Sequence, residues 1–226
     1  MRLLAIAPPT GEVSSKIIDR WDQAGAVGQL GVLLRTPTAP IASLIDPRFR
    51  GLVEGCLSRR IPLILSCEGE ALWRALKDPG PQRQAILDER VAGVQIRGNP
   101  SPQLLREIRR QLPDRTILGR SCHTQLQASA VRLDYTCVAP IFAPSTLQPG
   151  KQKKPAGLQL LRRWSRVLGS QERLFALGGM SASVIEPCLQ AGAHGIAGIQ
   201  AFFGTRSHVD RELGSMVPLI RRFFAD

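Results

Sequence analysis

The stretch Leu174-Phe-Ala-Leu-Gly-Gly-Met-Ser181 decides the predicted fold of this chain. A short apolar run, which is typical of a buried strand, ends in two glycines, and Ser181 then stands at an N-cap position ahead of a helical segment, residues 182–190. The next segment, Ala191-Gly-Ala-His-Gly-Ile-Ala-Gly-Ile-Gln200, contains a second buried strand that follows a glycine turn. Strand, Gly-Gly, helix, glycine turn and strand form the repeating unit of a parallel α/β fold.

The two glycines also predict a phosphate site. Gly178 and Gly179 have no side chains, so their amide groups can approach an anion closely. The start of the following helix adds its partial positive charge. Because phosphate sites in parallel barrels lie after the late strands, at their carboxyl ends, we expect this turn to hold a phosphate group.

Short apolar segments alternate with helical patterns along the whole chain. The predicted strands cover residues 3–7, 31–35, 62–66, 93–96, 116–121, 134–138, 173–177 and 195–199. The predicted helices cover residues 13–23, 41–58, 69–76, 102–111, 125–132, 156–167, 182–190 and 209–224. Eight such repeats predict an α/β fold of the (βα)8 TIM barrel type, in one domain over residues 1–226. A doubly wound sheet is the alternative, although an early GxGxxG motif is missing. The less regular residues 78–90 are a long connection or a second helix.

Composition restricts the classes of function. The formal net charge is +12, but the arginines are scattered over predicted helix faces without a nucleic-acid-binding motif, so a small anionic molecule is the expected partner. No apolar run is long enough for a membrane span. Five widely spaced cysteines without a CxxC motif are typical of free thiols, which indicates the cytoplasm. Association into a homo-oligomer is left open.

A serine and a histidine at the end of the fifth predicted strand are the candidate catalytic residues. Ser121 and His123 share one face of the strand because alternate residues point the same way. Arg120 and Cys122 point to the other face, which argues against a Cys122–His123 nucleophile pair. The Ser/His pair suits binding of a polar ring or proton transfer. No acidic orienter is visible, so a hydrolytic triad is disfavoured. For His123 the alternative is a helix-capping or loop-binding role.

Other polar residues are expected at the same end of the barrel. Arg35, at the end of the second predicted strand, is a candidate anion-binding charge. The proline-rich loop over residues 139–154 offers Ser145 and Thr146 as phosphate donors, and lysines within residues 151–154 as counter-charges. Long loops after barrel strands are often lids, and a solvated loop is the alternative. The remaining polar residues expected at this face are Ser66, Cys67, Gln95 and Arg97.

The sequence predicts no metal site and no further catalytic histidine. The strand ends hold no pair of Asp or Glu residues, since Asp46 and Glu68 stand alone, whereas Mg²⁺ prefers several oxygen ligands. His194 precedes the eighth predicted strand and is expected at the opposite end of the barrel, as a turn residue. His208 lies near the start of the last predicted helix and is also disfavoured as a catalytic group.

Four segments together resemble the thiamine phosphate synthase and TenI superfamily of (βα)8 barrels. They are Gly119-Arg-Ser-Cys-His-Thr124, Leu133-Asp-Tyr-Thr-Cys-Val-Ala-Pro-Ile-Phe142, Ala176-Leu-Gly-Gly-Met180 and residues 191–200. The arginine of the family's second strand corresponds to Arg35. The resemblance covers most of the chain and is most specific in its second half.

The resemblance implies a role for the predicted site residues. In this family the synthase joins an aminopyrimidine diphosphate to a thiazole phosphate and releases diphosphate with Mg²⁺. TenI members include thiazole phosphate tautomerases, which need no diphosphate site. By position, Gly178 and Gly179, with the backbone around Ile199 and Gln200, would hold the thiazole phosphate. Ser121 would face the pocket for the ring.

The chain also departs from the synthase pattern. Arg35 and Thr146 are what remains of the diphosphate site, and the acidic residues after the third and fourth strands correspond to Cys67 and, approximately, Pro100. We therefore expect a TenI-like protein of thiamine biosynthesis that binds thiazole phosphate or thiamine phosphate, as a tautomerase with His123 as its acid/base. No cofactor is expected, and Mg²⁺ only in a synthase. A synthase with rebuilt ligands and a catalytically silent regulatory binder are the alternatives.

Overall fold

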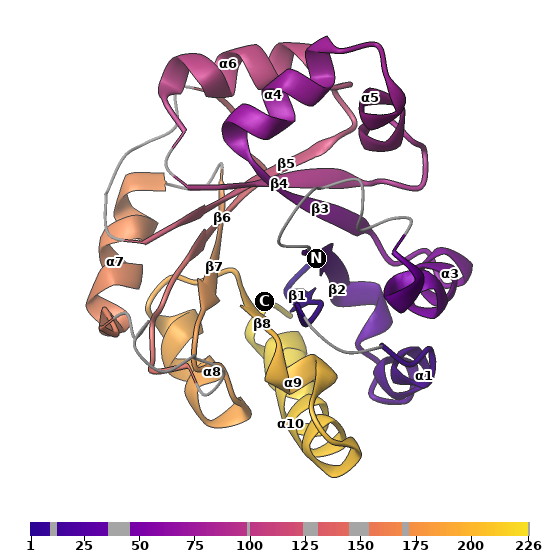
Figure 1. Ribbon diagram of the computed structural model, residues 1–226. Coiled ribbons are helices and arrows are strands. Elements are labelled where there is room, and N and C mark those ends of the chain that lie inside the picture. The colour runs from indigo at the N-terminus through magenta and orange to yellow at the C-terminus, as the bar shows by residue number, and fades with distance from the viewer. Residues whose placement is uncertain are drawn as a thin grey trace.

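A closed barrel of eight parallel strands forms the centre of the protein (Figure 1). The computed structural model describes residues 1–9, 13–35, 46–98, 100–123, 131–144, 154–168 and 172–225. The strands are β1 (Leu3–Ile6), β2 (Leu30–Leu34), β3 (Leu63–Glu68), β4 (Gly93–Arg97), β5 (Ile117–Cys122), β6 (Tyr135–Val138), β7 (Arg173–Leu177) and β8 (Gly195–Gly198). Each strand pairs with its neighbour in sequence, and β8 pairs with β1. The predicted (βα)8 barrel is confirmed, and every predicted strand overlaps an observed one.

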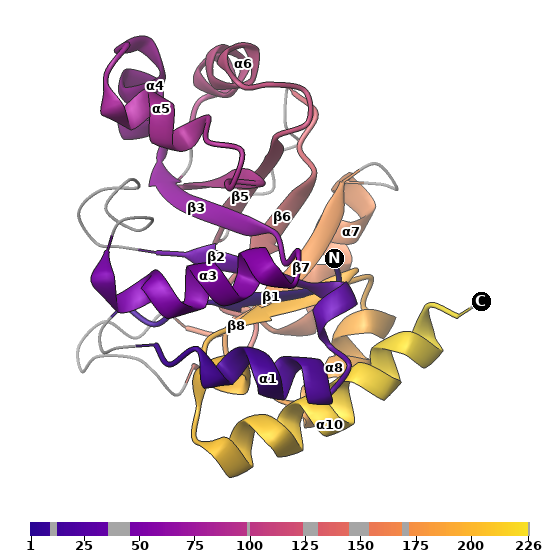
Figure 2. The ribbon, with the colours of Figure 1, turned by 90° about the vertical axis from the view of Figure 1, so that its right-hand side faces the viewer.

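Helices surround the barrel, as Figures 1 and 2 show from two directions. They are α1 (Lys16–Gln23), α3 (Arg50–Ser58), α4 (Gly69–Lys77), α5 (Pro81–Ile86), α6 (Pro102–Gln111), α7 (Gly157–Leu168), α8 (Ala182–Gln190), α9 (Gln200–Phe203) and α10 (Arg206–Phe223), with 3-10 turns η1 (Val27–Gln29) and η2 (Pro47–Phe49). None of the described helices is long and apolar enough to cross a membrane.

Most of the helix predictions agree with these bounds. The irregular segment over residues 78–90 contains a second helix, α5. The short helix α9 was not predicted, and α10 begins three residues before the predicted start at Val209 because Thr205 takes the N-cap position. The predicted helix over residues 125–132, and the first part of the one over residues 41–58, lie outside the described residues.

Two apolar layers arise from the alternation of side chains along each strand. Inward-facing residues form the barrel interior, which consists of Leu4, Ile6, Leu33, Ile64, Tyr135, Cys137, Phe175 and Ala197. Outward-facing residues, such as Leu3 and Leu174, pack against the helices in the larger layer. The Tyr135 and Phe175 rings meet edge to face inside the barrel, with their centroids 5.5 Å apart. Gly119 is needed beside them, since a Cβ there would overlap the Tyr135 ring.

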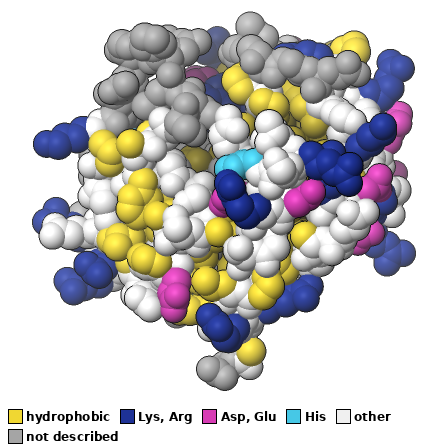
Figure 3. All heavy atoms as spheres, turned by 90° about the horizontal axis from the view of Figure 1, so that it is seen from below, with side chains coloured by type: hydrophobic (Ala, Val, Ile, Leu, Met, Phe, Trp, Pro, Cys, Tyr) yellow, Lys and Arg dark blue, Asp and Glu magenta, His cyan; other side chains and the backbone are white. Residues whose placement is uncertain are grey.

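The cysteines agree with the expectation of free thiols, and the surface carries charged side chains of both signs. All five cysteines are buried and unpaired. On the face seen in Figure 3, the Lys and Arg side chains are scattered among acidic, apolar and neutral ones.

Candidate functional site

Two connected cavities open at the carboxyl ends of the strands. The larger has a volume of about 630 Å³ and is bordered by the segments after β5, β6, β7 and β8. The smaller, of about 250 Å³, lies toward β2, β3 and β4. Both are lined by Ile6, Arg35, His123, Ala139 and Leu177. We refer to the two cavities together as the barrel mouth.

The Gly178-Gly179 turn borders the larger cavity and has a conformation that favours glycine. The φ angles are +94° at Gly178 and +65° at Gly179, in the left-handed region. The segment after β6 also approaches closely: a Cβ would lie 2.8 Å from Pro140 Cβ at Gly178, and 2.8 Å from the Ala143 carbonyl oxygen at Gly179. Within the described chain, neither glycine amide has a protein acceptor. Both are therefore available to an anion.

A carboxylate modifies the helix start that follows this turn. Ser181 is the N-cap of α8, as predicted, but its hydroxyl makes no capping bond and lies 2.9 Å from the Ser183 hydroxyl. The Ala182 amide instead donates to Glu212 Oε2 of α10 at 2.6 Å. The partial positive charge expected from the helix start is thus offset by a carboxylate. The start of α8 therefore does not contribute to the predicted anion site, which consists of the glycine turn and its neighbours. Nothing in the sequence indicated the Glu212 contact that causes this difference.

The segment after β8 completes this side of the mouth. Ile199 and Gln200, where the short helix α9 begins, line the same cavity as the two glycines. The amide of Ile199 has no protein acceptor among the described residues. The four backbone positions that the resemblance assigns to phosphate therefore border one cavity.

Ser121 and His123 both line the smaller cavity, so their predicted common face points into the mouth. The Nδ1 atom of His123 lies 2.9 Å from the Ala139 carbonyl oxygen. A carbonyl only accepts, so Nδ1 carries the proton and, in the neutral ring, Nε2 keeps its lone pair. His123 therefore presents a hydrogen-bond acceptor, or a base, that is held by its other nitrogen.

The neighbours of this pair point away from the mouth, as predicted. Arg120 is buried, with its Nε donating to Thr136 Oγ1 at 2.8 Å and its guanidinium over the Trp164 ring of α7. Cys122 is also buried, and that burial raises the pKa of its thiol. A Cys122–His123 nucleophile pair is thereby excluded.

His208, which the sequence argument disfavours, also lines the larger cavity. Its Nδ1 atom lies 3.1 Å from Arg211 Nη2. A guanidinium only donates, so Nδ1 accepts and Nε2–H is left as a donor in the neutral ring, opposite to His123. Gly204 makes room for the imidazole, because a Cβ there would lie 2.7 Å from His208 Cδ2. His208 thus lies close to the rim of the active face, as expected for a residue near the start of the last helix, and the unpredicted helix α9 directly precedes that helix.

His194 directly precedes β8 and so lies at the opposite end of the barrel from the mouth, as predicted. Its Nδ1 accepts from the Leu174 amide at 3.2 Å. Burial, and then the charges of Arg2 and Arg173, lower the pKa of its imidazole. A neutral ring that accepts a backbone bond is a structural group.

The remaining predicted residues divide into two groups. Arg35 borders both cavities, as expected of an anion-binding charge. Ser145, Thr146, Lys151 and Lys153 lie outside the described residues. The first of the described residues after them, Lys154, is exposed. The contribution of this loop to phosphate binding stays a prediction.

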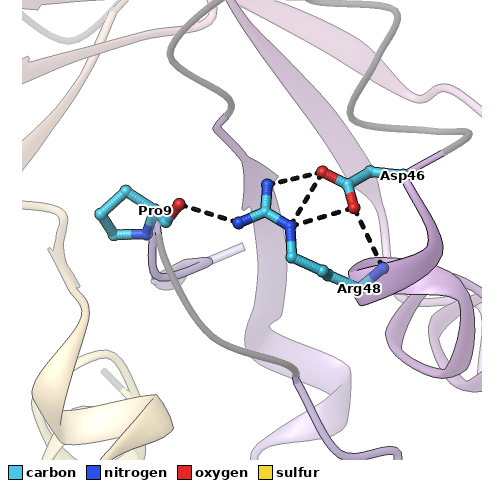
Figure 4. Close-up of polar contacts among 3 residues, drawn as sticks. All are labelled: Pro9, Asp46 and Arg48. Carbon is cyan, nitrogen blue, oxygen red and sulfur yellow. Dashed lines mark hydrogen bonds and ion pairs between the residues drawn. The ribbon is translucent and has the colours of Figure 1, made fainter.

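The residues present do not fit the Mg²⁺ ion that the resemblance implies for a synthase. The described chain contains no group of three His, Cys, Asp or Glu residues that could hold a metal. Arg48 donates to the carboxylate of Asp46 and to the Pro9 carbonyl (Figure 4). The hydrogen bond from Arg48 lowers the pKa of Asp46. Glu68 lies in the smaller cavity beside Arg97. Of the stretches outside the described residues, 36–45 and 145–153 contain no Asp or Glu in their sequence, whereas 10–12 includes Glu12. Among the described residues, the carboxylates that Mg²⁺ prefers are therefore lacking.

Comparison with known proteins assigns the chain to a family. Residues 84–202 match a family described as Thiamine monophosphate synthase. A thiamine-phosphate synthase of Saccharopolyspora erythraea is 33% identical over 97 residues, which cover 41% of this chain and 42% of that protein. The thiamine-phosphate synthase of Gloeobacter violaceus is 28% identical over 211 residues, which cover 88% of this chain and 52% of that protein. The chain thus spans about half the length, or less, of the curated relatives it matches.

Solved structures share the fold at lower identity. Thiamine phosphate pyrophosphorylase from Pyrococcus furiosus superposes with a TM-score of 0.65 at 16% identity, covering 99% of this chain and 96% of that chain. A tryptophan synthase alpha-subunit, also from Pyrococcus furiosus, reaches 0.61 at 12% identity, covering 96% and 98%. The matched family region includes His123 and the Gly178-Gly179 turn but not Arg35. The chain belongs to the thiamine monophosphate synthase family.

Proposed function

We propose that this protein acts in thiamine biosynthesis by binding thiazole phosphate or thiamine phosphate at the barrel mouth. The observation that carries the proposal is the Gly178-Gly179 turn, whose two amides have no acceptor in the described chain and border a cavity of about 630 Å³. Unbonded amides that converge on a cavity are suited to a phosphate group. Membership of the family supports the thiamine class of ligand.

Both sides of the larger cavity contribute to phosphate binding in this proposal. The phosphate accepts from the amides of Gly178, Gly179 and Ile199, and from His208 Nε2–H. A hydrogen bond to a charged group contributes about 1.5–3 kcal/mol, so each donor has a measurable effect. The ring of the ligand lies toward Ser121 and His123, which line the adjoining cavity.

The reaction that the described residues support is a proton transfer on the thiazole ring. His123 Nε2 takes a proton from a carbon beside the ring and returns it at a second position, so the tautomer changes and no atom is lost. The Ala139 carbonyl, 2.9 Å from His123 Nδ1, holds the imidazole of His123 in place and stabilises the imidazolium during transfer. No metal takes part in these steps.

A second candidate reaction is the synthesis of thiamine phosphate. The names of the curated relatives favour it, since they are thiamine-phosphate synthases. It requires a second, diphosphate-bearing substrate beside the thiazole phosphate. Arg35 is the described residue best suited to that substrate, with Thr146 and the lysines of residues 151–154 as further ligands.

The ligand is tested by calorimetric titration of the full chain with thiazole phosphate and with its unphosphorylated alcohol. Gly179→Ala should weaken binding of the phosphate ester about tenfold or more, on the order of 1.4 kcal/mol, because a side chain displaces the turn. A Cβ there would lie 2.7 Å from Phe142 Cβ. Gly28→Ala is the matched control, since a Cβ at Gly28 meets no atom within 4 Å. Equal affinity for ester and alcohol would contradict the proposal.

The reaction is tested separately. Proton transfer predicts exchange of the ring-adjacent proton with D2O, observed by NMR and slowed roughly 10²–10⁴-fold in His123→Ala. Synthase activity predicts diphosphate release from the two substrates with Mg²⁺. Tight binding without exchange or release would identify a catalytically silent regulatory binder.

A further inference from the structure

We propose that the smaller cavity is a second anion subsite, which binds an oxyanion directly through Arg35 and Arg97 and needs no divalent metal. The ligand class is a phosphoryl or carboxylate group, on a separate molecule or on the far end of a longer ligand. The proposal goes beyond the phosphate ester placed at the Gly178-Gly179 turn and does not depend on it.

Strand register brings the two arginines to one cavity. Arg97 is the last residue of β4 and is paired in register with Glu68, the last residue of β3. Arg35 follows the last residue of β2, which is the other neighbour of β3. Arg35, Arg97 and Glu68 all line the cavity of about 250 Å³. Two arginine side chains therefore border the same cavity from the two sides of β3.

The positive charge in this cavity is not balanced within the described chain. Glu68 is the one described carboxylate among the residues that line it. The Glu68 side chain is 65% exposed, and its oxygen lies 3.9 Å from Arg97 Nη2, so the pair is long and screened by solvent. Burial and the neighbouring charge of Arg97 lower the pKa of Arg35. Two like charges that border one cavity are stabilised when an anion enters between them.

Buried polar atoms in the same cavity also lack partners. Arg97 Nε and Ser66 Oγ are buried without a hydrogen bond among the described residues, and Ser66 is only 1% exposed. Gln95 accepts from the Tyr135 hydroxyl at 2.9 Å through its carbonyl oxygen, which leaves its amide nitrogen to donate. A buried polar atom without a partner is costly. The unpartnered groups here are all able to donate, which is what an oxyanion requires.

The same set of groups is unfavourable to a metal ion. Two arginines repel a divalent cation, and a single exposed carboxylate supplies too few oxygen ligands for Mg²⁺. An oxyanion, by contrast, matches the planar fork of each guanidinium. The chemistry of the cavity therefore points to direct capture by arginine, where a metal-dependent site would place carboxylates.

The test is calorimetric titration of the full chain with inorganic diphosphate in EDTA, repeated with excess Mg²⁺. We expect binding in EDTA, and weaker binding when Mg²⁺ competes for the diphosphate. Arg97→Met should weaken binding at least tenfold. Arg110→Met, on the exposed face of α6, removes the same charge outside the cavity and should leave the affinity unchanged.

Each other outcome has a definite meaning. Binding that requires Mg²⁺, or equal weakening by Arg97→Met and Arg110→Met, would overturn the subsite, as would the absence of diphosphate binding. Repeating the titration with saturating thiazole phosphate distinguishes the two proposals. If thiazole phosphate does not bind while diphosphate still binds through Arg97, the proposed function fails and the subsite stands.

Discussion

The two sides of the barrel mouth offer different groups to an anion. Beyond β7 and β8 the groups are main-chain amides, at Gly178, Gly179 and Ile199. At the ends of β2 and β4 they are the side chains of Arg35 and Arg97. The first site is created mainly by backbone conformation, with His208 as a side-chain donor, and we expect a change in the turn to alter it most. The second depends on charge and is removed by a single substitution, so it should also be the more sensitive to salt.

The largest expected effect is on the backbone side. Gly178→Ala should lower the free energy of unfolding by about 2–4 kcal/mol, because a side chain at positive φ is strained and the added Cβ displaces Pro140. That Cβ would lie 2.9 Å from Pro140 Cα. Urea denaturation measures the change, with Gly28→Ala as the control, which should shift stability by less than about 1 kcal/mol. Equal stability of the two variants would show that the turn tolerates a side chain.

A smaller effect is expected from His208, the side chain that we propose as a further phosphate donor beside the backbone amides. His208→Ala should weaken thiazole phosphate binding about tenfold, since the Nε2–H bond to phosphate is lost. His208→Gln should retain most of the affinity, because the glutamine amide can occupy the position of Nε2–H. Calorimetry on both variants decides. Similar losses in the two would contradict the tautomer that Arg211 sets at 3.1 Å.

On the arginine side, a substitution should raise the stability of the protein when no anion is present, whereas the Gly178 substitution lowers it. Arg97→Met should raise the free energy of unfolding by about 1 kcal/mol, because it removes a buried unpartnered Nε and the repulsion of Arg35. Thermal and urea denaturation in phosphate-free buffer measure the change. A clear loss of stability would mean that Arg97 is a structural residue.

The smallest effect is expected at His194, at the opposite end of the barrel from both proposed anion sites. Burial lowers the pKa of His194 in the folded chain, so the unfolded chain binds its proton more readily. Stability is therefore expected to fall as the pH drops below about 6.5, the ordinary histidine value. His194→Asn should flatten this part of the profile, measured by denaturation across pH 5–7.5. An unchanged slope would assign the dependence to another group.

Much of the framework could be predicted from sequence because its signals are local. Buried parallel strands are short apolar runs, and all eight were found at nearly their observed bounds. The alternation rule placed Ser121 and His123 on the inner face, and the glycine pair marked the turn after β7. These conclusions need no knowledge of which elements meet in space.

The rest of the site depends on contacts between distant segments. Glu212 reaches the Ala182 amide across 30 positions of sequence, and nothing near either residue signals that contact. His208 was expected near the rim of the mouth, but its contact with Arg211, which sets its tautomer, could not be predicted. Arg97 could be placed at the correct face, but its proximity to Arg35 follows from the register across β3. Pairings of this kind are set by packing and cannot be read from periodicity.

The aromatic rings inside the barrel determine from which end ligands reach the cavities. Tyr135 and Phe175 are both buried and meet edge to face on the barrel axis, while the Tyr135 hydroxyl is tied to Gln95. The barrel interior is therefore filled beneath the two cavities, and a ligand of either cavity enters and leaves at the carboxyl ends of the strands.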